Sequence, residues 1–390
     1  QEVENGRYEV YFGDGVLGQG IADGNIVILD YITCNLDEPN GASSFTLSGT
    51  VGGFANVTIT TLNNASNGSS PETIKSIKYN APRDYSAQDR AVTAEDYKVL
   101  VKSLYANAQS VQVYGGEDAA VPDYGKVYIS IKAKSGSNLT EVTKTSLVQS
   151  LKSFAVASVT PVIIDPETTF ITLTTTFKYD SSLTTKDIST LQTNVINSIS
   201  SYNTDTLENF TGMFRYSAVG QVIDGADTSI LSNITKIKMY KYITPTLNSG
   251  LKYTLSFNNA FYNPHSGHNA SAGGIVSSTG FKISGDDTNE HFLDDDGAGN
   301  VRVYYLSGTT RIYTNSTYGT IDYTAGEIIL TSSNITSISN VDGAASTQIR
   351  VTVLPDSNDI IPVRNQVLSV DTANSTVSGS IDEIESGSSQ

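Results

Sequence analysis

Apolar and polar residues follow different periods in different parts of the chain, and these periods divide it into three regions. Up to about residue 80, apolar residues come in short β-branched or aromatic runs, namely Arg7–Phe12, Ile26–Ile32, Phe45–Leu47 and Val57–Thr61. Tracts rich in Gly, Asn and Ser separate these runs. Such runs predict strands joined by turns and loops. We therefore expect residues 1–80 to form a β-rich region with long loops.

Helical and strand periods alternate between residues 81 and 245. Thr93 is a residue type that caps helices, and Asp96 occupies the third helical position behind it. An apolar stripe follows, made of Tyr97, Leu100, Val101 and Leu104. Its i, i+3, i+4, i+7 spacing is that of one helix face. Further helices are predicted after Thr140 and Thr185. Alternating apolar positions predict strands at 111–114, 126–132, 171–179 and 236–242. This order is typical of an α+β domain whose helices cover a sheet.

Beyond about residue 245 the helical period disappears. Short strand-like runs separated by glycine turns predict an all-β domain, a sandwich or a small barrel, over residues 246–390. The Ser-, Gly- and Glu-rich tail from Ser375 is expected to be loose. The chain as a whole is thus predicted to be a multidomain α+β protein.

Composition narrows the classes of partner. A formal net charge of −16 and a pI of about 4.5 argue against nucleic acid and anionic membrane surfaces. No apolar stretch approaches the roughly 20 residues needed to cross a bilayer, so membrane insertion is not expected. Cys34 is the only cysteine in the sequence, which fits assembly in a reducing cytosol. Because the chain starts at Gln1, almost inside a predicted strand, we expect it to be a C-terminal fragment of a larger protein.

The stretch GDGVLG, Gly13–Gly18, satisfies the G-x-G-x-x-G pattern of dinucleotide-binding sites. That fingerprint requires a helix to begin at the last glycine. Gly20 and Gly24 follow within a few residues, and glycine costs about 1 kcal/mol relative to alanine inside a helix. We therefore expect a turn here and no nucleotide cofactor.

Two motifs resemble metal sites. His265 and His268 form an H-x-x-H pair, with His291 as the third histidine, but the pair lies in a predicted loop without a neighbouring Cys or Glu. The acidic run Asp294–Asp296 resembles the start of a calcium loop, but Ala298 and Tyr305 occupy two of the ligand positions. A hairpin tip is the expected structure, and weak cation binding there is left open. No metal site is predicted.

The sequence contains no recognisable catalytic motif, so we expect neither an enzyme nor a cofactor. A carboxylate pair assembled from distant positions, as in glycoside hydrolases, stays an open alternative.

Residues Ala81–Ile131 resemble the baseplate J family of contractile phage tails and related injection machines. The segment Arg90–Tyr97, RAVTAEDY, carries most of this resemblance, and the turn Phe12–Gly15, FGDG, also matches. Together they cover roughly residues 7–243. The GGED turn at Gly115–Asp118 and the β-rich end look most like the wedge proteins of T4-like phages.

The resemblance implies a structural subunit that dimerises, joins neighbouring wedges into a ring around the tail hub, and takes part in the baseplate conformational change before sheath contraction. The implied partners are a second copy, other baseplate wedge proteins and tail components. The implied location is the virion tail baseplate, after assembly in the host cytoplasm. The N-terminal part beyond the chain would hold the helical part of such a protein. The resemblance supplies no catalytic residues.

Other functions compete with this interpretation. A receptor- or glycan-binding tail protein is the main alternative, and a carbohydrate-active enzyme is a third. Tyrosine is enriched among interface anchors, so Tyr240 and Tyr304, in two Tyr-rich strands, are candidate anchors of an assembly interface.

Overall fold

The structure is a computed structural model. It describes residues 2–3, 7–16, 18–30, 33, 35–36, 38–40, 42–61, 65, 68, 70–119, 121–134, 138–268, 270 and 273–382. The chain divides into two compact units, Gln1–Ser70 and Pro71–Gln390, and each is described by itself.

In the first unit, paired strands are confined, within the described ranges, to β1 (Glu2–Val3) and β2 (Arg7–Tyr8), which are antiparallel. Residues 26–30, 45–47 and 57–61, where the sequence predicts strands, are irregular. Their apolar side chains, such as Ile26 and Ile28, are exposed. Without a buried face, nothing fixes the register of a strand. The prediction of strands at these positions is therefore wrong.

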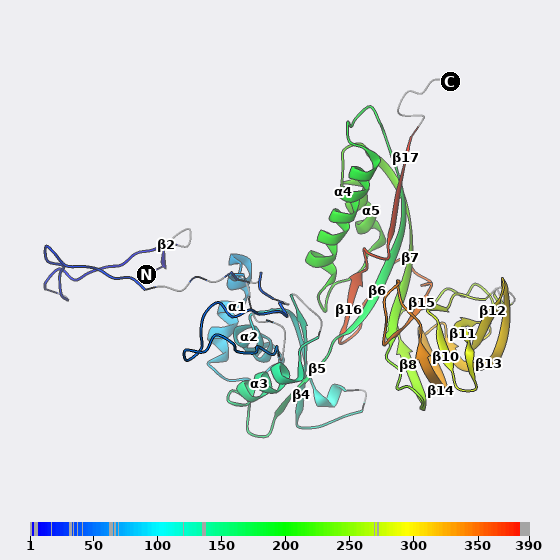
Figure 1. The fold of residues 1–390 in the computed structure, drawn as a ribbon, viewed down its shortest axis with the longest axis horizontal. Coiled ribbons are helices and arrows are strands. Elements are labelled where there is room, and N and C mark those ends of the chain that lie inside the picture. The colour runs from blue at the N-terminus through cyan, green and yellow to red at the C-terminus, as the bar shows by residue number, and fades with distance from the viewer. Residues whose placement is uncertain are drawn as a thin grey trace. The chain divides into compact units, whose positions relative to one another are not determined.

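Residues 74–164, the first module, build a small α+β core (Figure 1). Its helices are α1 (Ile74–Ala87), α2 (Ala94–Leu104) and α3 (Glu141–Lys152), and its strands are β3 (Ala108–Gly115), β4 (Lys126–Ala133) and β5 (Thr160–Ile164). A 3-10 turn, η2 (Gly116–Asp118), follows β3. The sheet order is β3-β4-β5, with β3 antiparallel and β5 parallel to β4.

The start of α2 confirms the sequence prediction. Thr93 Oγ1 accepts a hydrogen bond from the amide of Asp96 at 3.3 Å, and Asp96 Oδ2 accepts one from the amide of Thr93 at 2.8 Å. This capping box satisfies two amides that the helix itself leaves unpaired. Tyr97, Leu100 and Val101 are buried as the helical spacing predicts, whereas Leu104, the last residue of the helix, is 40% exposed. The helix α1 and the strand β5 were not predicted.

Residues 167–243 and 349–381 form the second module. The long antiparallel pair β6 (Glu167–Tyr179) and β7 (Ile230–Ile243) is its centre. Helices α4 (Ile188–Tyr202) and α5 (Tyr216–Asp224) cover one face of this pair, and a π-helical turn, η3 (Asn203–Leu207), follows α4 (Figure 1). The sequence predicts an inward-facing stripe of Ile188, Leu191, Val195 and Ile199 on α4. The last three are buried in the same core as the inner face of β6, whereas Ile188, at the start of the helix, is 40% exposed.

Residues 250–338 form a small barrel. Its strands are β8 (Gly250–Ser256), β10 (Phe281–Ile283), β11 (Asp286–Asp295), β12 (Asn300–Ser307), β13 (Thr310–Asp322) and β14 (Glu327–Ile338). Because β10 pairs with both β11 and β14, the strands β10 to β14 close into a ring, and β8 adds to β14 outside it.

After the barrel the chain returns to the second module. β15 (Ile349–Val353) pairs antiparallel with β7, and β9 (Ser277–Ser278) pairs with β15. β16 (Gln366–Val370) and β17 (Thr376–Ile381) pair in parallel with successive parts of β6. The tail expected to be loose from Ser375 is therefore a paired strand up to Ile381.

The predicted fold class, a mixed α+β chain with a β-rich C-terminal region, is confirmed. The domain limits near residues 80 and 245 stay predictions. Pairing between β7 and β15 crosses the second of these limits.

Docking of β17 can be tested at Gly379. A Cβ atom at this position would lie 2.5 Å from Cζ of Phe177, a side chain with no exposed surface. We expect Gly379→Val to lower the free energy of unfolding by about 1–3 kcal/mol, the usual cost of overpacking. Ser380→Val, at the exposed neighbouring position, is the control and should change little. Equal stability of the two variants in chemical denaturation would show that β17 does not pack on the core.

Candidate functional site

The glycine-rich stretch at residues 13–18 is a tight turn. The amide of Gly15 donates to the carbonyl oxygen of Gly18 at 3.1 Å, and their φ angles of 87° and 99° lie in the region that favours glycine. Residues 18–30 contain no helix, so the helix N-terminus that would face a pyrophosphate does not follow. The predicted turn is confirmed. Cys34 lies outside the described residues.

Asp294 lies in strand β11, before the hairpin tip, and is buried in a charged network. Its Oδ1 accepts from Arg302 Nε at 2.9 Å, and its Oδ2 accepts from Arg311 Nη1 at 2.7 Å and from the hydroxyl of Tyr313 at 2.8 Å. The Arg302 guanidinium also stacks over the Tyr313 ring, 4.3 Å from its centroid. Both oxygens of the carboxylate are therefore occupied by cationic or hydroxyl donors of the barrel itself.

The two neighbouring acids also hold protein donors. Asp295 Oδ1 accepts from the amide of Val276 at 2.8 Å, and its Oδ2 accepts from the hydroxyl of Tyr323 at 2.6 Å. Burial, and the Asp295 carboxylate to which it donates, raise the pKa of Tyr323 above its ordinary value. Asp296 binds the amide and side chain of Asn300 across the hairpin tip. The acidic run thus fixes the loop before β9 against the barrel.

The histidines are divided between a loop and a strand. His265 Nε2 lies 3.4 Å from His268 Nδ1 in the loop. His291 is fully buried in β11, and within the described part of the chain neither ring nitrogen has a hydrogen-bond partner, although Nε2 lies 3.5 Å from Asp286 Oδ2. Burial lowers the pKa of His291. Over the described residues, no group of three or more His, Cys, Asp or Glu side chains is arranged to hold a metal ion.

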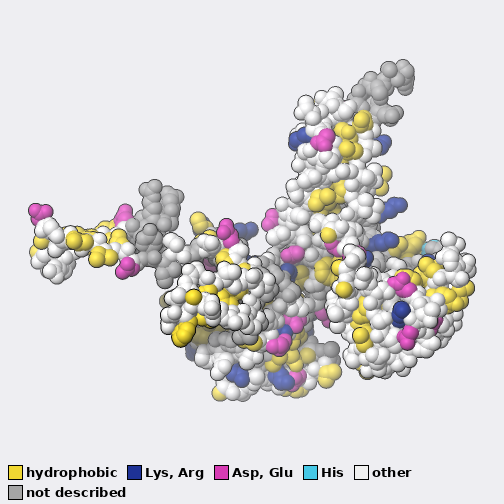
Figure 2. Space-filling view, viewed as in Figure 1, with side chains coloured by type: hydrophobic (Ala, Val, Ile, Leu, Met, Phe, Trp, Pro, Cys, Tyr) yellow, Lys and Arg dark blue, Asp and Glu magenta, His cyan; other side chains and the backbone are white. Residues whose placement is uncertain are grey.

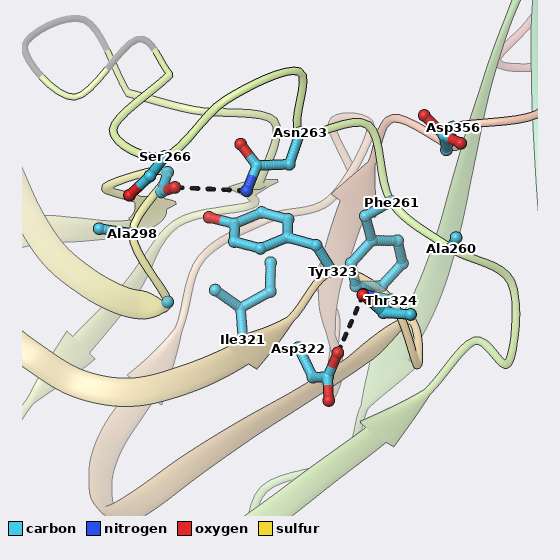
Figure 3. Close-up of a pocket in the computed structure, with 12 residues that line it drawn as sticks. Ala260, Phe261, Asn263, Ser266, Ala298, Ile321, Asp322, Tyr323, Thr324 and Asp356 are labelled. Atoms are coloured by element: carbon cyan, nitrogen blue, oxygen red, sulfur yellow. Dashed lines mark hydrogen bonds between the residues drawn. The ribbon is translucent and has the colours of Figure 1, made fainter.

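An open polar cleft of about 640 Å³ lies at one end of the barrel (Figure 3). The side-chain amide of Asn263 donates to the carbonyl oxygen of Gly297 at 3.3 Å, while its buried Oδ1 has no hydrogen-bond partner among the residues that the structure describes. The carboxylate of Asp322 accepts from the amide of Thr324 at 2.9 Å. Neither Asp322 nor Asp356, which also lines the cleft, forms an ion pair among the described residues. The cleft is therefore rich in acceptors, which suit hydroxyl or ammonium donors.

A second cleft, of about 810 Å³, lies where the two modules and the barrel meet. Lys132 Nζ of the first module lies 3.5 Å from Glu208 Oε2 of the second. The buried Lys241 binds Glu167 Oε2 at 2.9 Å and the carbonyl oxygen of Ser256 at 2.7 Å. The cationic and anionic side chains of this cleft neutralise one another in pairs.

Polar bonds join the modules along strand β3, which is the edge strand of the first sheet. The amide of Asn365 donates to Gln112 Oε1 at 2.7 Å, and its side chain donates to the hydroxyl of Tyr114 at 2.9 Å. The amide of Phe210 donates to Ser110 Oγ at 3.3 Å. Two separate loops of the second module thus hold one edge of the first. Such a polar seam resembles a domain interface rather than a continuous core.

Two protein-family models match these two modules. The family model "Baseplate structural protein gp6, C-terminal domain I" matches residues 93–164, and "C-terminal domain III" of the same protein matches residues 167–242. The "Baseplate wedge protein gp6" of Enterobacteria phage T4 is 28% identical over 284 residues. The resemblance to a phage baseplate wedge protein is confirmed.

The aligned region covers 65% of this chain and 42% of the T4 protein, so the chain spans less than half the length of that relative. Among solved structures, a chain of the anti-feeding prophage baseplate aligns with a TM-score of 0.31 and 12% identity. That alignment covers 44% of this chain and 38% of the other chain. The two matched domains correspond to the first module without α1 and to the β6–β7 core of the second.

The tyrosines proposed as interface anchors are buried. Tyr240 is 2% exposed, stacks on Phe170 at 4.9 Å and donates to Asp371 Oδ2 at 2.6 Å. Tyr304 is 8% exposed inside the barrel sheet. Because their side chains already pack within the unit, the prediction that they anchor an outer interface is wrong.

The Asp294 network generates a stability prediction. Asp294→Asn removes the negative charge that balances Arg302, which is 8% exposed. We expect a loss of about 3–5 kcal/mol in unfolding free energy, because breaking a buried pair leaves an uncompensated charge. Asp84→Asn, at an exposed position on α1, is the control. If Asp294→Asn were as stable as this control in urea denaturation, the network would not hold the barrel.

Because His291 is buried, we predict that the stability of the chain depends on pH. The folded-state pKa of His291 lies below the ordinary value of 6.5, so the unfolded chain takes up a proton first as the pH falls. Stability should therefore fall between pH 7.5 and 5, by up to about 1.4 kcal/mol per pH unit. His291→Phe should weaken this dependence, whereas His265→Gln, at an exposed position, should retain it. Identical pH profiles for His291→Phe and the unaltered chain in urea denaturation would contradict the prediction.

Proposed function

We propose that the chain is a structural subunit of a contractile phage tail baseplate wedge. It self-associates, joins neighbouring wedges into a ring around the tail hub, and takes part in the conformational change that precedes sheath contraction. The observation that carries the proposal is the match of two neighbouring modules to two gp6 domains, together with the T4 alignment. The virion tail baseplate is its location, and it is not an enzyme.

The architecture is consistent with a mechanical role. The first module has its own buried core, separate from the core that the second module shares with the barrel, and hydrogen bonds and ion pairs join the two modules. Polar domain interfaces permit rigid-body motion more readily than apolar ones do. The open cleft around Lys132 and Glu208 leaves space for such a motion. Its partners are a second copy, the other wedge proteins and tail components.

The polar cleft of Figure 3 favours one second candidate. Carboxylate and amide acceptors such as Asp322, Asp356 and Asn263 suit sugar hydroxyls, so a receptor- or glycan-binding tail protein is the alternative.

The two functions are separated by a solution experiment. The purified chain should sediment as a dimer whose mass is stable on dilution, and it should co-elute with the other wedge proteins of its phage but not with the capsid protein. A strict monomer that enters no wedge complex would contradict the proposal. Saturable glycan binding by that monomer, lost in Asp322→Asn/Asp356→Asn, would establish the alternative.

A further inference from the structure

One face of the second module's sheet has no covering layer over part of its length. Helices α4 and α5 pack on the inner face of β6, β7 and β17 (Figure 1). On the opposite face, side chains from Lys178 and Ser232 as far as Thr174 and Lys238 are exposed, whereas Tyr240, farther along the same face, is buried. We call this surface the open face. Its residues, which follow from the strand registers, are Thr174, Thr176 and Lys178 of β6, Ser232, Ile234, Lys236 and Lys238 of β7, and Thr376, Ser378 and Ser380 of β17.

The open face carries cations and no carboxylate, although the whole chain has a net charge of −16. Lys236 and Lys238 form no ion pair among the described residues. Lys178 lies 3.9 Å from Asp382, just beyond the end of β17. Figure 2 shows Lys and Arg side chains along this margin of the second module. These three of the chain's 24 Lys and Arg residues make the open face locally cationic on an acidic protein.

Protection against aggregation is the ordinary explanation for lysines here. The outer edge of β7 is unpaired from Ile230 to Lys238 in the described structure, because β15 joins only at 239–243. Lysine beside such an edge discourages unwanted strand pairing. This explanation leaves Ile234 unaccounted for, since that side chain is 69% exposed between the lysines and the end of the strand. Covering this side chain with a docked segment would remove apolar surface from water.

The charge and spacing of the lysines indicate what kind of ligand the open face binds. Lys236 and Lys238 point the same way from alternate positions of one strand, about 7 Å apart. An extended segment with acidic residues at alternate positions has the same spacing and the opposite charge. Symmetric pairing with a second copy would place lysine against lysine, which is unfavourable. Nucleic acid binding typically uses about 6–10 phosphate contacts, and this face supplies three lysines.

From these observations we infer that the open face docks an extended, carboxylate-bearing segment of another baseplate protein. The identity of the partner as a baseplate protein rests on the proposed function, whereas the chemistry of the docking surface does not.

The chemistry is tested with a probe peptide. An alternating Thr–Glu octapeptide should shift the NMR signals of β6, β7 and β17, and binding should weaken with added salt. Lys236→Glu/Lys238→Glu should reduce its affinity tenfold or more, since charge reversal replaces attraction by repulsion. Lys75→Glu/Lys78→Glu on α1 makes the same change in net charge at exposed positions and should bind normally. Because glutamate retains a charge beside the open edge, loss of binding would not be explained by aggregation.

The second part of the test measures wedge assembly. With the purified wedge proteins offered one at a time, the Lys236→Glu/Lys238→Glu chain should lose one partner and keep the dimer mass of the unaltered chain. Loss of the dimer instead would make the open face a contact between copies and overturn the inference. The inference would also be overturned if the unaltered chain and the Lys236→Glu/Lys238→Glu variant bound the peptide equally well, or if the unaltered chain preferred a DNA oligonucleotide to the peptide.

The two proposals can fail separately. If the unaltered chain joins wedges and the double variant joins them equally, the inference about the open face is wrong while the proposed function stands. If the unaltered chain joins none but binds the peptide as expected, the proposed function fails and the docking chemistry stands.

Discussion

The antiparallel pairing of β6 with β7 is the constraint on which the second module depends. It runs from Phe170–Tyr240 to Tyr179–Ile230, and its inner side chains, such as Leu173 and Phe177, are fully buried. Helices α4 and α5 need this face to bury their own apolar stripes, because isolated helices of this length are marginal in water. The returning strands β15, β16 and β17 need its two edges. Only two residues, Asp165 and Pro166, separate the end of β5 from the start of β6. The first module is thus tethered directly to this pair and held by the polar seam along β3.

Sequence patterns predicted the elements that are stabilised by contacts between residues close together in the sequence. The capping box of Thr93 and Asp96 forms within four residues, and the alternation along 171–179 needs only one buried face. The short strands β16 and β17 have no such signal. Each pairs in parallel with a strand nearly 200 residues earlier, and a run such as Thr376–Ile381 carries little apolar character to announce it. Strand-like runs near the N-terminus fail in the opposite way, because composition favours strands where no buried surface supports them.

The candidate sites show a similar division. The sequence indicated that Asp294–Asp296 lies at a hairpin, and β11 and β12 do pair around it. What it could not show was that Arg302 and Arg311, 8 and 17 residues away, would turn toward Asp294, since that depends on the closure of the barrel. Tyrosine enrichment pointed to Tyr240 as a surface anchor, but frequency does not show that Phe170, Arg350 and Asp371 contact its side chain. Lys132 and Glu208, which meet across the module seam, carry no motif.

The distribution of charge links these features. The buried cations Arg302 and Lys241 each have a nearby carboxylate, that of Asp294 and that of Glu167, and the half-buried Lys132 has Glu208. Such pairing is required where water is excluded, because an isolated buried charge is costly. On the open face the rule is not followed, since Lys236 and Lys238 stand beside hydroxyls and Ile234. Exposed lysines tolerate this in water, so their presence alone would mean little. Among the described residues neither lysine forms an ion pair, on a chain with 40 acidic residues. This leaves a surface that attracts what the rest of the protein repels, and an assembly subunit can use that contrast to select an acidic neighbour.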